Sequence, residues 1–182
     1  MLIKTYNFTG KHAMYMANLV GDNLSSDNAE QDNVERTAFF KRNIDVMFAA
    51  AVLGFKLNRK GQIEPSNEKK RTILNEQIIR EQSTIQFLYR MIVILDDSID
   101  MSLEDKLKAA FATNTTSVAS SENENYDDEH EKIFYQYILG GIEYLYENLI
   151  GNGNNPIDNI GQLLDDFQYK EEEKNYNNVP II

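Results

Sequence analysis

Ile44-Asp-Val-Met-Phe-Ala-Ala-Ala-Val-Leu-Gly-Phe-Lys-Leu57 is the stretch that decides the fold, because ten consecutive residues, Val46 to Phe55, carry no charge. A helix that is apolar on all sides must be covered by protein or by lipid. A membrane span needs about 20 apolar residues, and this stretch is too short for one. The sequence therefore predicts a helix buried at the centre of a helical domain.

Outward from this stretch, apolar residues recur at three- and four-residue steps, which is typical of helices. The spacing predicts a helix over 33–58 around the apolar stretch. Further helices are expected over 10–20, 68–95, 102–112 and 128–150, with a last one after Pro156. Thr9 and Ser102 are expected to cap the helices that follow them.

Residues 1–8 alternate imperfectly and are expected to be extended, while a period of two is nearly absent elsewhere. We therefore expect an all-α, single-domain bundle of about five helices with a buried central helix. The helical domain would span 1–170, with a mobile acidic loop at 113–129 and a charged, Asn-rich tail at 171–182.

Two glycines, Gly140 and Gly141, stand in the middle of the predicted helix over 128–150. Each costs about 1 kcal/mol relative to alanine inside a helix. Close approach of another helix would offset this cost. We expect that helix to be the apolar one, which carries Ala49-Ala50-Ala51 and Gly54.

The 182 residues carry a formal charge of -11, with 29 acidic and 18 basic side chains and a pI near 4.6. This balance disfavours non-specific binding to nucleic acids and to anionic membranes. There is no cysteine, so thiolate metal sites, disulfides and cysteine nucleophiles are excluded. No signal peptide or membrane span is expected, and a cytoplasmic location is the expectation.

The acidic run Asp96-Asp97-Ser98-Ile99-Asp100 is the sharpest candidate for chemistry. It resembles the DDxxD motif with which helical isoprenoid synthases bind Mg²⁺ around a diphosphate. Carboxylates at positions i, i+1 and i+4 would project to one side of a helix and offer oxygen ligands. A second acidic pair, Asp165-Asp166, lacks the closing aspartate, and no arginine pair follows Asp100. The structural alternative is a solvated helix end, in which case no cofactor is expected.

A basic region between residues 56 and 71 is the main candidate for binding a partner or phosphate. Cations at the end of a helix also complement its dipole, which is the structural alternative for part of the region. Two tyrosines on the helix over 128–150 are expected to share an exposed face, as at protein interfaces. The candidate partner-binding residues are Lys56, Arg59, Lys60, Lys69, Lys70, Arg71, Tyr135 and Tyr146.

Three further polar residues are expected to have structural roles. Arg42 and Asp45 lie one helical turn apart where the apolar stretch begins, and they predict a half-buried ion pair. Arg90 lies within an apolar helix and is expected to reach Asp45 or another carboxylate, or to extend to solvent. The two histidines, His12 and His130, are expected to be surface or packing residues.

These observations favour a non-catalytic helical subunit that docks to other proteins, or to itself, in a bacterial multiprotein assembly such as a phage-defence or restriction system. One alternative is a Mg²⁺-dependent all-α enzyme that acts on a diphosphate through Asp96, Asp97 and Asp100. The other is a nucleic-acid accessory protein that uses the basic region, although the net charge disfavours it.

Overall fold

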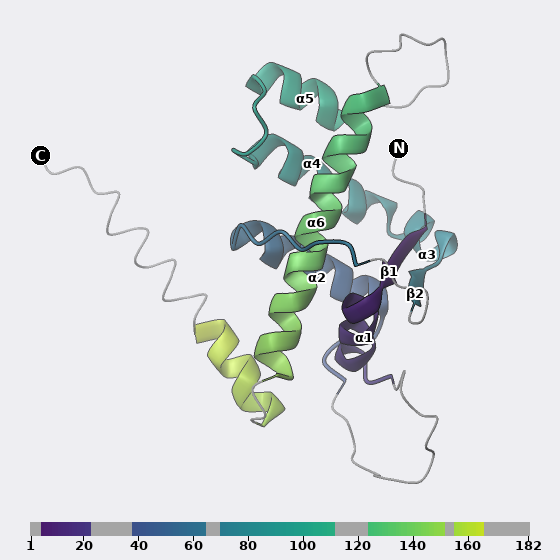
Figure 1. Cartoon of the computed structure of the whole chain (residues 1–182), viewed down its shortest axis with the longest axis vertical. Helices are drawn as coiled ribbons and strands as arrows, with labels where there is room; N and C mark the ends of the chain where they lie inside the picture. Colours follow the sequence, from purple (N-terminus) through teal and green to yellow (C-terminus); the bar gives the residue numbers. More distant parts are fainter. Residues whose placement is uncertain (1–4, 23–37, 65–69, 112–123, 152–154, 166–182) are drawn as a thin grey trace, which may run out of the picture.

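The computed structural model describes residues 5–22, 38–64, 70–111, 124–151 and 155–165, and it is an all-α bundle with one small sheet (Figure 1). Residues 156–165 form a helical segment after the labelled elements. No described helix is both long enough and apolar enough to cross a membrane. The labelled elements are β1 (Tyr6–Thr9), α1 (Gly10–Leu19), α2 (Asn43–Lys56), β2 (Lys70–Ile73), α3 (Asn75–Arg80), α4 (Gln82–Leu95), α5 (Leu103–Phe111) and α6 (Glu124–Leu149).

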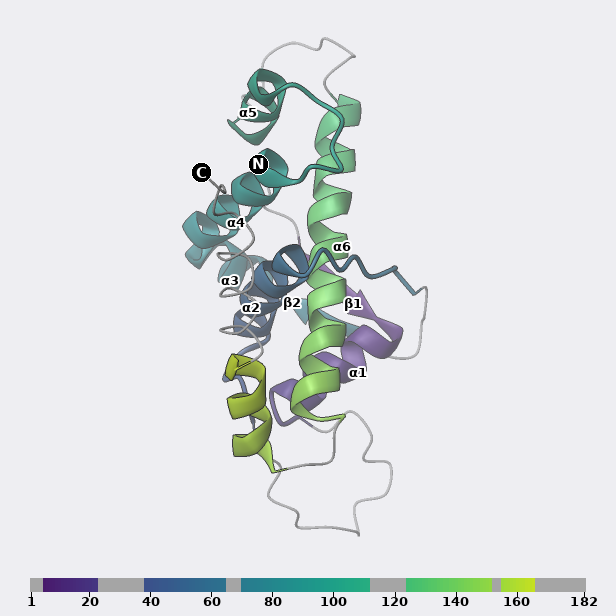
Figure 2. The same ribbon diagram turned by 90° about the vertical axis from the view of Figure 1, so that its left-hand side faces the viewer.

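The long helix α6 is the axis of the bundle, and the other elements pack around it (Figures 1 and 2). Its most extensive contact is with α2, followed by α1. The predicted bundle with a buried central helix is thus confirmed, although α6 rather than α2 takes the central place. The apolar stretch is not covered on all sides, because Val52 is 42% exposed.

The glycines of α6 bring its backbone against α2, as predicted. A Cβ atom on Gly141 would lie 1.9 Å from the carbonyl oxygen of Ala50, and one on Gly54 would lie 2.0 Å from that of Tyr137. Gly140 faces the residues after α2, where a Cβ atom would lie 2.0 Å from the Arg59 carbonyl oxygen. No side chain fits at these positions, so the helix–helix contact offsets the intrinsic cost of glycine.

The expected helix over 68–95 is wrong in its first part. Residues 70–73 form β2, which pairs antiparallel with β1 from Tyr6↔Ile73 to Thr9↔Lys70. Two helices, α3 and α4, follow with a break at Glu81. Strand pairing over 60 residues of chain is a tertiary contact, and it overrides local helix propensity here.

Of the two predicted helix caps, one is confirmed and one is wrong. Ser102 caps α5 as predicted, since its hydroxyl accepts a hydrogen bond from the Asp105 N–H at 3.2 Å. Thr9 does not cap α1 with its side chain, because its hydroxyl donates to the Glu64 carbonyl at 2.6 Å.

The helix α2 begins at Asn43, after residues 38–42, which are not helical. The helix α6 begins at Glu124, inside the range 113–129 expected to be a loop. Residues 113–123 and 171–182 lie outside the described residues.

Candidate functional site

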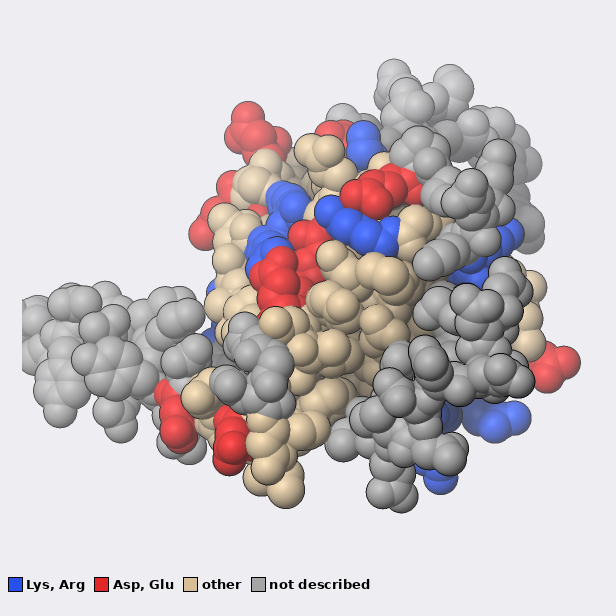
Figure 3. Space-filling model, turned by 60° about the horizontal axis from the view of Figure 1, so that its bottom comes forward, with Lys and Arg blue, Asp and Glu red and all other residues tan. Residues whose placement is uncertain are grey.

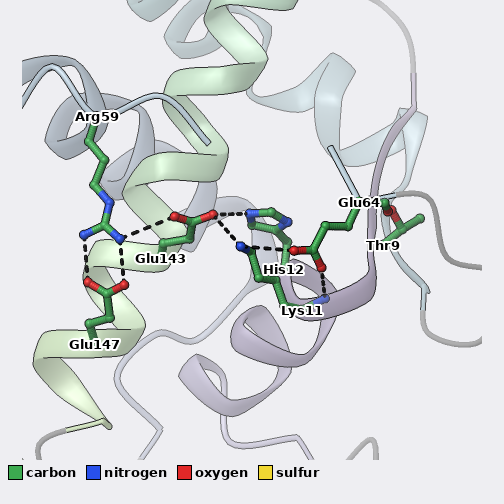
Figure 4. A network of polar contacts seen from close by, with 7 residues as sticks. All are labelled: Thr9, Lys11, His12, Arg59, Glu64, Glu143 and Glu147. Carbon is green, nitrogen blue, oxygen red and sulfur yellow. Dashed lines mark hydrogen bonds and ion pairs between the residues drawn. The ribbon is translucent and has the colours of Figure 1, made fainter. Parts of the chain in front are cut away.

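A network of charged side chains joins α1, the segment 59–64 and α6 (Figure 4). Lys11 and His12 stand in the first turn of α1. Glu143 and Glu147 stand one turn apart on α6. The fold brings together residues separated by more than 130 positions, and the pattern along the chain gave no sign of this cluster.

Glu143 is the centre of the network. Its Oε1 lies 2.9 Å from His12 Nε2 and 3.3 Å from Lys11 Nζ, and its Oε2 accepts a 3.3 Å hydrogen bond from Arg59. Arg59 also binds Glu147 through two nitrogens, at 2.6 and 2.7 Å. Lys11 Nζ lies 3.1 Å from Glu64. Every charged group drawn in Figure 4 therefore has an opposite partner.

Burial sets the protonation of this network. His12 is 1% exposed, and burial lowers its pKa, although the bond to Glu143 acts in the opposite direction. Burial raises the pKa of Glu143, but hydrogen bonds from His12 and Lys11 outweigh it and hold the pKa below its usual value. A neutral His12 that donates its Nε2–H to an ionised Glu143 follows from these shifts.

A histidine oriented by a carboxylate is half of a general-base arrangement, which also needs an accessible reacting group. His12 is closed off from solvent, and the nearby hydroxyl of Thr9 donates to the Glu64 carbonyl. The arrangement therefore fits a polar clamp between three segments better than a catalytic centre.

A second polar cluster surrounds Asp96, which is 3% exposed. Its carboxylate accepts hydrogen bonds from the Ser98 N–H at 2.8 Å and the Tyr137 hydroxyl at 3.0 Å, and it lies 3.2 Å from Lys60 Nζ. Burial raises the pKa of Asp96, but these bonds outweigh burial and lower it. Burial and the bond to Asp96 raise the pKa of Tyr137.

The geometry expected of the acidic run is wrong. The helix α4 ends at Leu95, so Asp96 turns inward while Asp97 and Asp100 are exposed. Asp165 is exposed at the end of the last helical segment, and Asp166 lies outside the described residues. Among the residues that the structure describes, no three His, Asp or Glu side chains are grouped closely enough to hold a metal ion.

The basic region does not form one open patch in the described residues. Arg59 is bound to Glu143 and Glu147, and Lys60 is bound to Asp96 and to the Ser98 hydroxyl. On the face shown in Figure 3, Lys and Arg side chains lie beside Asp and Glu side chains.

The remaining residues of the basic region are dispersed. Arg71 pairs with Asp22 at 2.9 Å. Lys70 and Lys56 are exposed on β2 and at the end of α2 respectively. Lys69 lies outside the described residues.

The two tyrosines lie on one side of α6, as predicted, but they are not open. Tyr135 packs against Tyr6 and Phe8, with ring centroids 6.3 and 5.5 Å apart, and Tyr146 stacks on Tyr15 at 3.9 Å. The N-terminal elements β1 and α1 cover this side of α6, which sequence periodicity did not indicate.

Arg42, Asp45 and Arg90, which are expected to have structural roles, make only some of the predicted contacts. Arg42 binds Asp45 at 2.6 Å as predicted, and it also binds Glu81 at 2.9 Å. The pair lies toward the surface rather than half-buried, since Arg42 is exposed. Among the described residues, Arg90 does not pair with a carboxylate. Its guanidinium donates to the Ala110 carbonyl at 3.3 Å and lies over the Phe111 ring at 4.6 Å.

The apolar surface on α5 is not among the features expected from the sequence, which predicts only a short helix over 102–112. Its signal was present, because Leu103, Leu107 and Phe111 recur every four residues and therefore share one face. In the structure they are 64%, 41% and 54% exposed. We name these three residues the α5 face.

Known proteins supply no assignment for either polar cluster or for the α5 face. No protein-family model, no curated protein and no solved structure matches the chain.

Proposed function

We propose that this chain is a non-catalytic helical subunit that acts by docking to other protein chains, of the kind used in bacterial multiprotein assemblies. The observation that carries the proposal is the α5 face, where three large apolar side chains are between 41% and 64% exposed. The paired state of the charged clusters supports it indirectly, because their side chains are engaged within the chain.

The helix α5 is held in place by the flank that carries Lys106 and Ala110. Lys106 is buried and donates to the Asp96 carbonyl at 2.7 Å, and Ala110 is buried with its carbonyl bound by Arg90. These two contacts hold α5 antiparallel along α4 (Figure 1). The contacts of Lys106 and Ala110 with the end and the middle of α4 therefore fix the direction in which the α5 face is exposed.

Exposure of the α5 face has an energetic cost that a partner would remove. Full burial of a Leu or Phe side chain is worth about 1.5–3 kcal/mol. Glu104, Asp105 and Lys108 are exposed around the face. An apolar patch with a polar rim is the usual composition of a protein-binding surface.

The two alternative functions have weaker support. The Mg²⁺-dependent reading needs three carboxylates on one side, whereas Asp96 is turned toward Lys60 and Tyr137. The nucleic-acid reading needs open cations, whereas Arg59 and Arg71 are engaged by carboxylates.

The test is a pull-down from a lysate of the source organism with three tagged forms of the full chain. Leu107→Asp places a charge at the centre of the α5 face. Ile160→Asp is the matched control, because Ile160 is also 41% exposed and lies in the helical segment at the other end of the molecule (Figure 1).

We expect the wild-type chain and Ile160→Asp to retain the same protein, and Leu107→Asp to lose at least 90% of it. Copies of the chain itself count as a retained protein. Equal recovery with all three forms, or none with any form, would overturn the proposal.

A further inference from the structure

We draw no further inference here: the strongest candidate, the exposed apolar patch that Leu103, Leu107 and Phe111 form on α5, carries none, because nothing in the described part of the structure shows what covers it.

Discussion

The two ends of the bundle differ in which side chains they bury and which they expose. Around α1 and the C-terminal half of α6, polar and charged side chains pair with one another, and His12 is almost fully buried against Glu143. At the α4–α5 end, Leu103 and Phe87 point outward although they are apolar. The charged side chains of the first end are paired within the chain, whereas the apolar side chains of the second are largely exposed.

The comparison shows how to separate structural chemistry from functional surface in this protein. A cluster of charges attracts attention as an active site, but here its members satisfy one another and join remote segments. Buried charges are tolerated when they are paired and hydrogen-bonded. An uncovered apolar face has no such internal explanation, and it is the better candidate for function.

The largest effect on stability is expected at the backbone contact between α2 and α6, where Gly141 lies against Ala50. Gly141→Ala places a Cβ atom 1.9 Å from the Ala50 carbonyl oxygen, so α2 and α6 must separate. We expect a loss of about 3 kcal/mol in the free energy of unfolding, at the upper end of overpacking costs. Urea denaturation measures this loss.

The matched control for this substitution is Gly161→Ala. No atom lies within 4 Å of the position that its Cβ would occupy, so the variant should be as stable as the wild type or slightly more stable. A loss below 1 kcal/mol for Gly141→Ala would show that the two helices are not in backbone contact.

The next largest loss of stability is expected when Asp96 is substituted. Asp96→Asn keeps the shape of the side chain but leaves Lys60 without its buried counter-charge. We expect a loss of about 2 kcal/mol, typical of a buried hydrogen-bonded charge. Thermal unfolding compares it with Asp97→Asn, whose side chain is exposed and whose change should stay within about 0.5 kcal/mol.

The same measurement tests the metal-binding alternative. If Asp96 only binds Lys60 and Tyr137, millimolar Mg²⁺ should leave the midpoint temperature of thermal unfolding of the wild-type chain unchanged. A rise of several degrees that disappears in Asp97→Asn would instead favour a metal site at the acidic run.

A smaller effect is expected from pH, and it should come from the polar end. The folded pKa of His12 is lowered by burial, so the unfolded chain binds the extra proton more readily. The stabilisation from neutral His12 is complete above the unfolded pKa of about 6.5 and is lost as pH falls toward the folded pKa. Denaturation between pH 8 and pH 5 measures this slope.

His12→Gln should show a shallower slope over this interval, because glutamine can donate to Glu143 without titrating. The lowered pKa of Glu143 acts in a separate window below its usual value of 4.5. Identical slopes for the wild type and His12→Gln would exclude His12 as the source of the acid sensitivity.

The smallest effect should come from the α5 face itself. Leu107→Asp should change the free energy of unfolding by no more than about 0.5 kcal/mol, as at other surface positions. Thermal unfolding of the variant and the wild type measures this change. A large loss would mean that Leu107 supports the fold of the chain itself.

Much of the helical scaffold could be predicted because its signals are local. The apolar stretch from Ile44, the cap at Ser102 and the paired glycines Gly140 and Gly141 each depend on nearby residues or on a steric need that only glycine meets. The Arg42–Asp45 pair was also foreseen, since it spans one helical turn.

The errors concern contacts between distant segments. The pairing of β1 with β2, the covering of Tyr135 by β1 and the inward turn of Asp96 each depend on which element lies opposite. The geometry predicted for the acidic run 96–100 is wrong for the same reason. Its spacing places the three carboxylates on one face only if the helix continues past Leu95, where α4 ends.

The order of apolar and small residues by itself determined that this protein is a helical bundle, because helix periodicity and the cost of glycine act along the chain. Only the tertiary structure decided that Glu143 would join Lys11, His12 and Arg59, and that the α5 face would be largely exposed among the described residues. Burial and charge pairing depend on neighbours brought together in space, which no local pattern records.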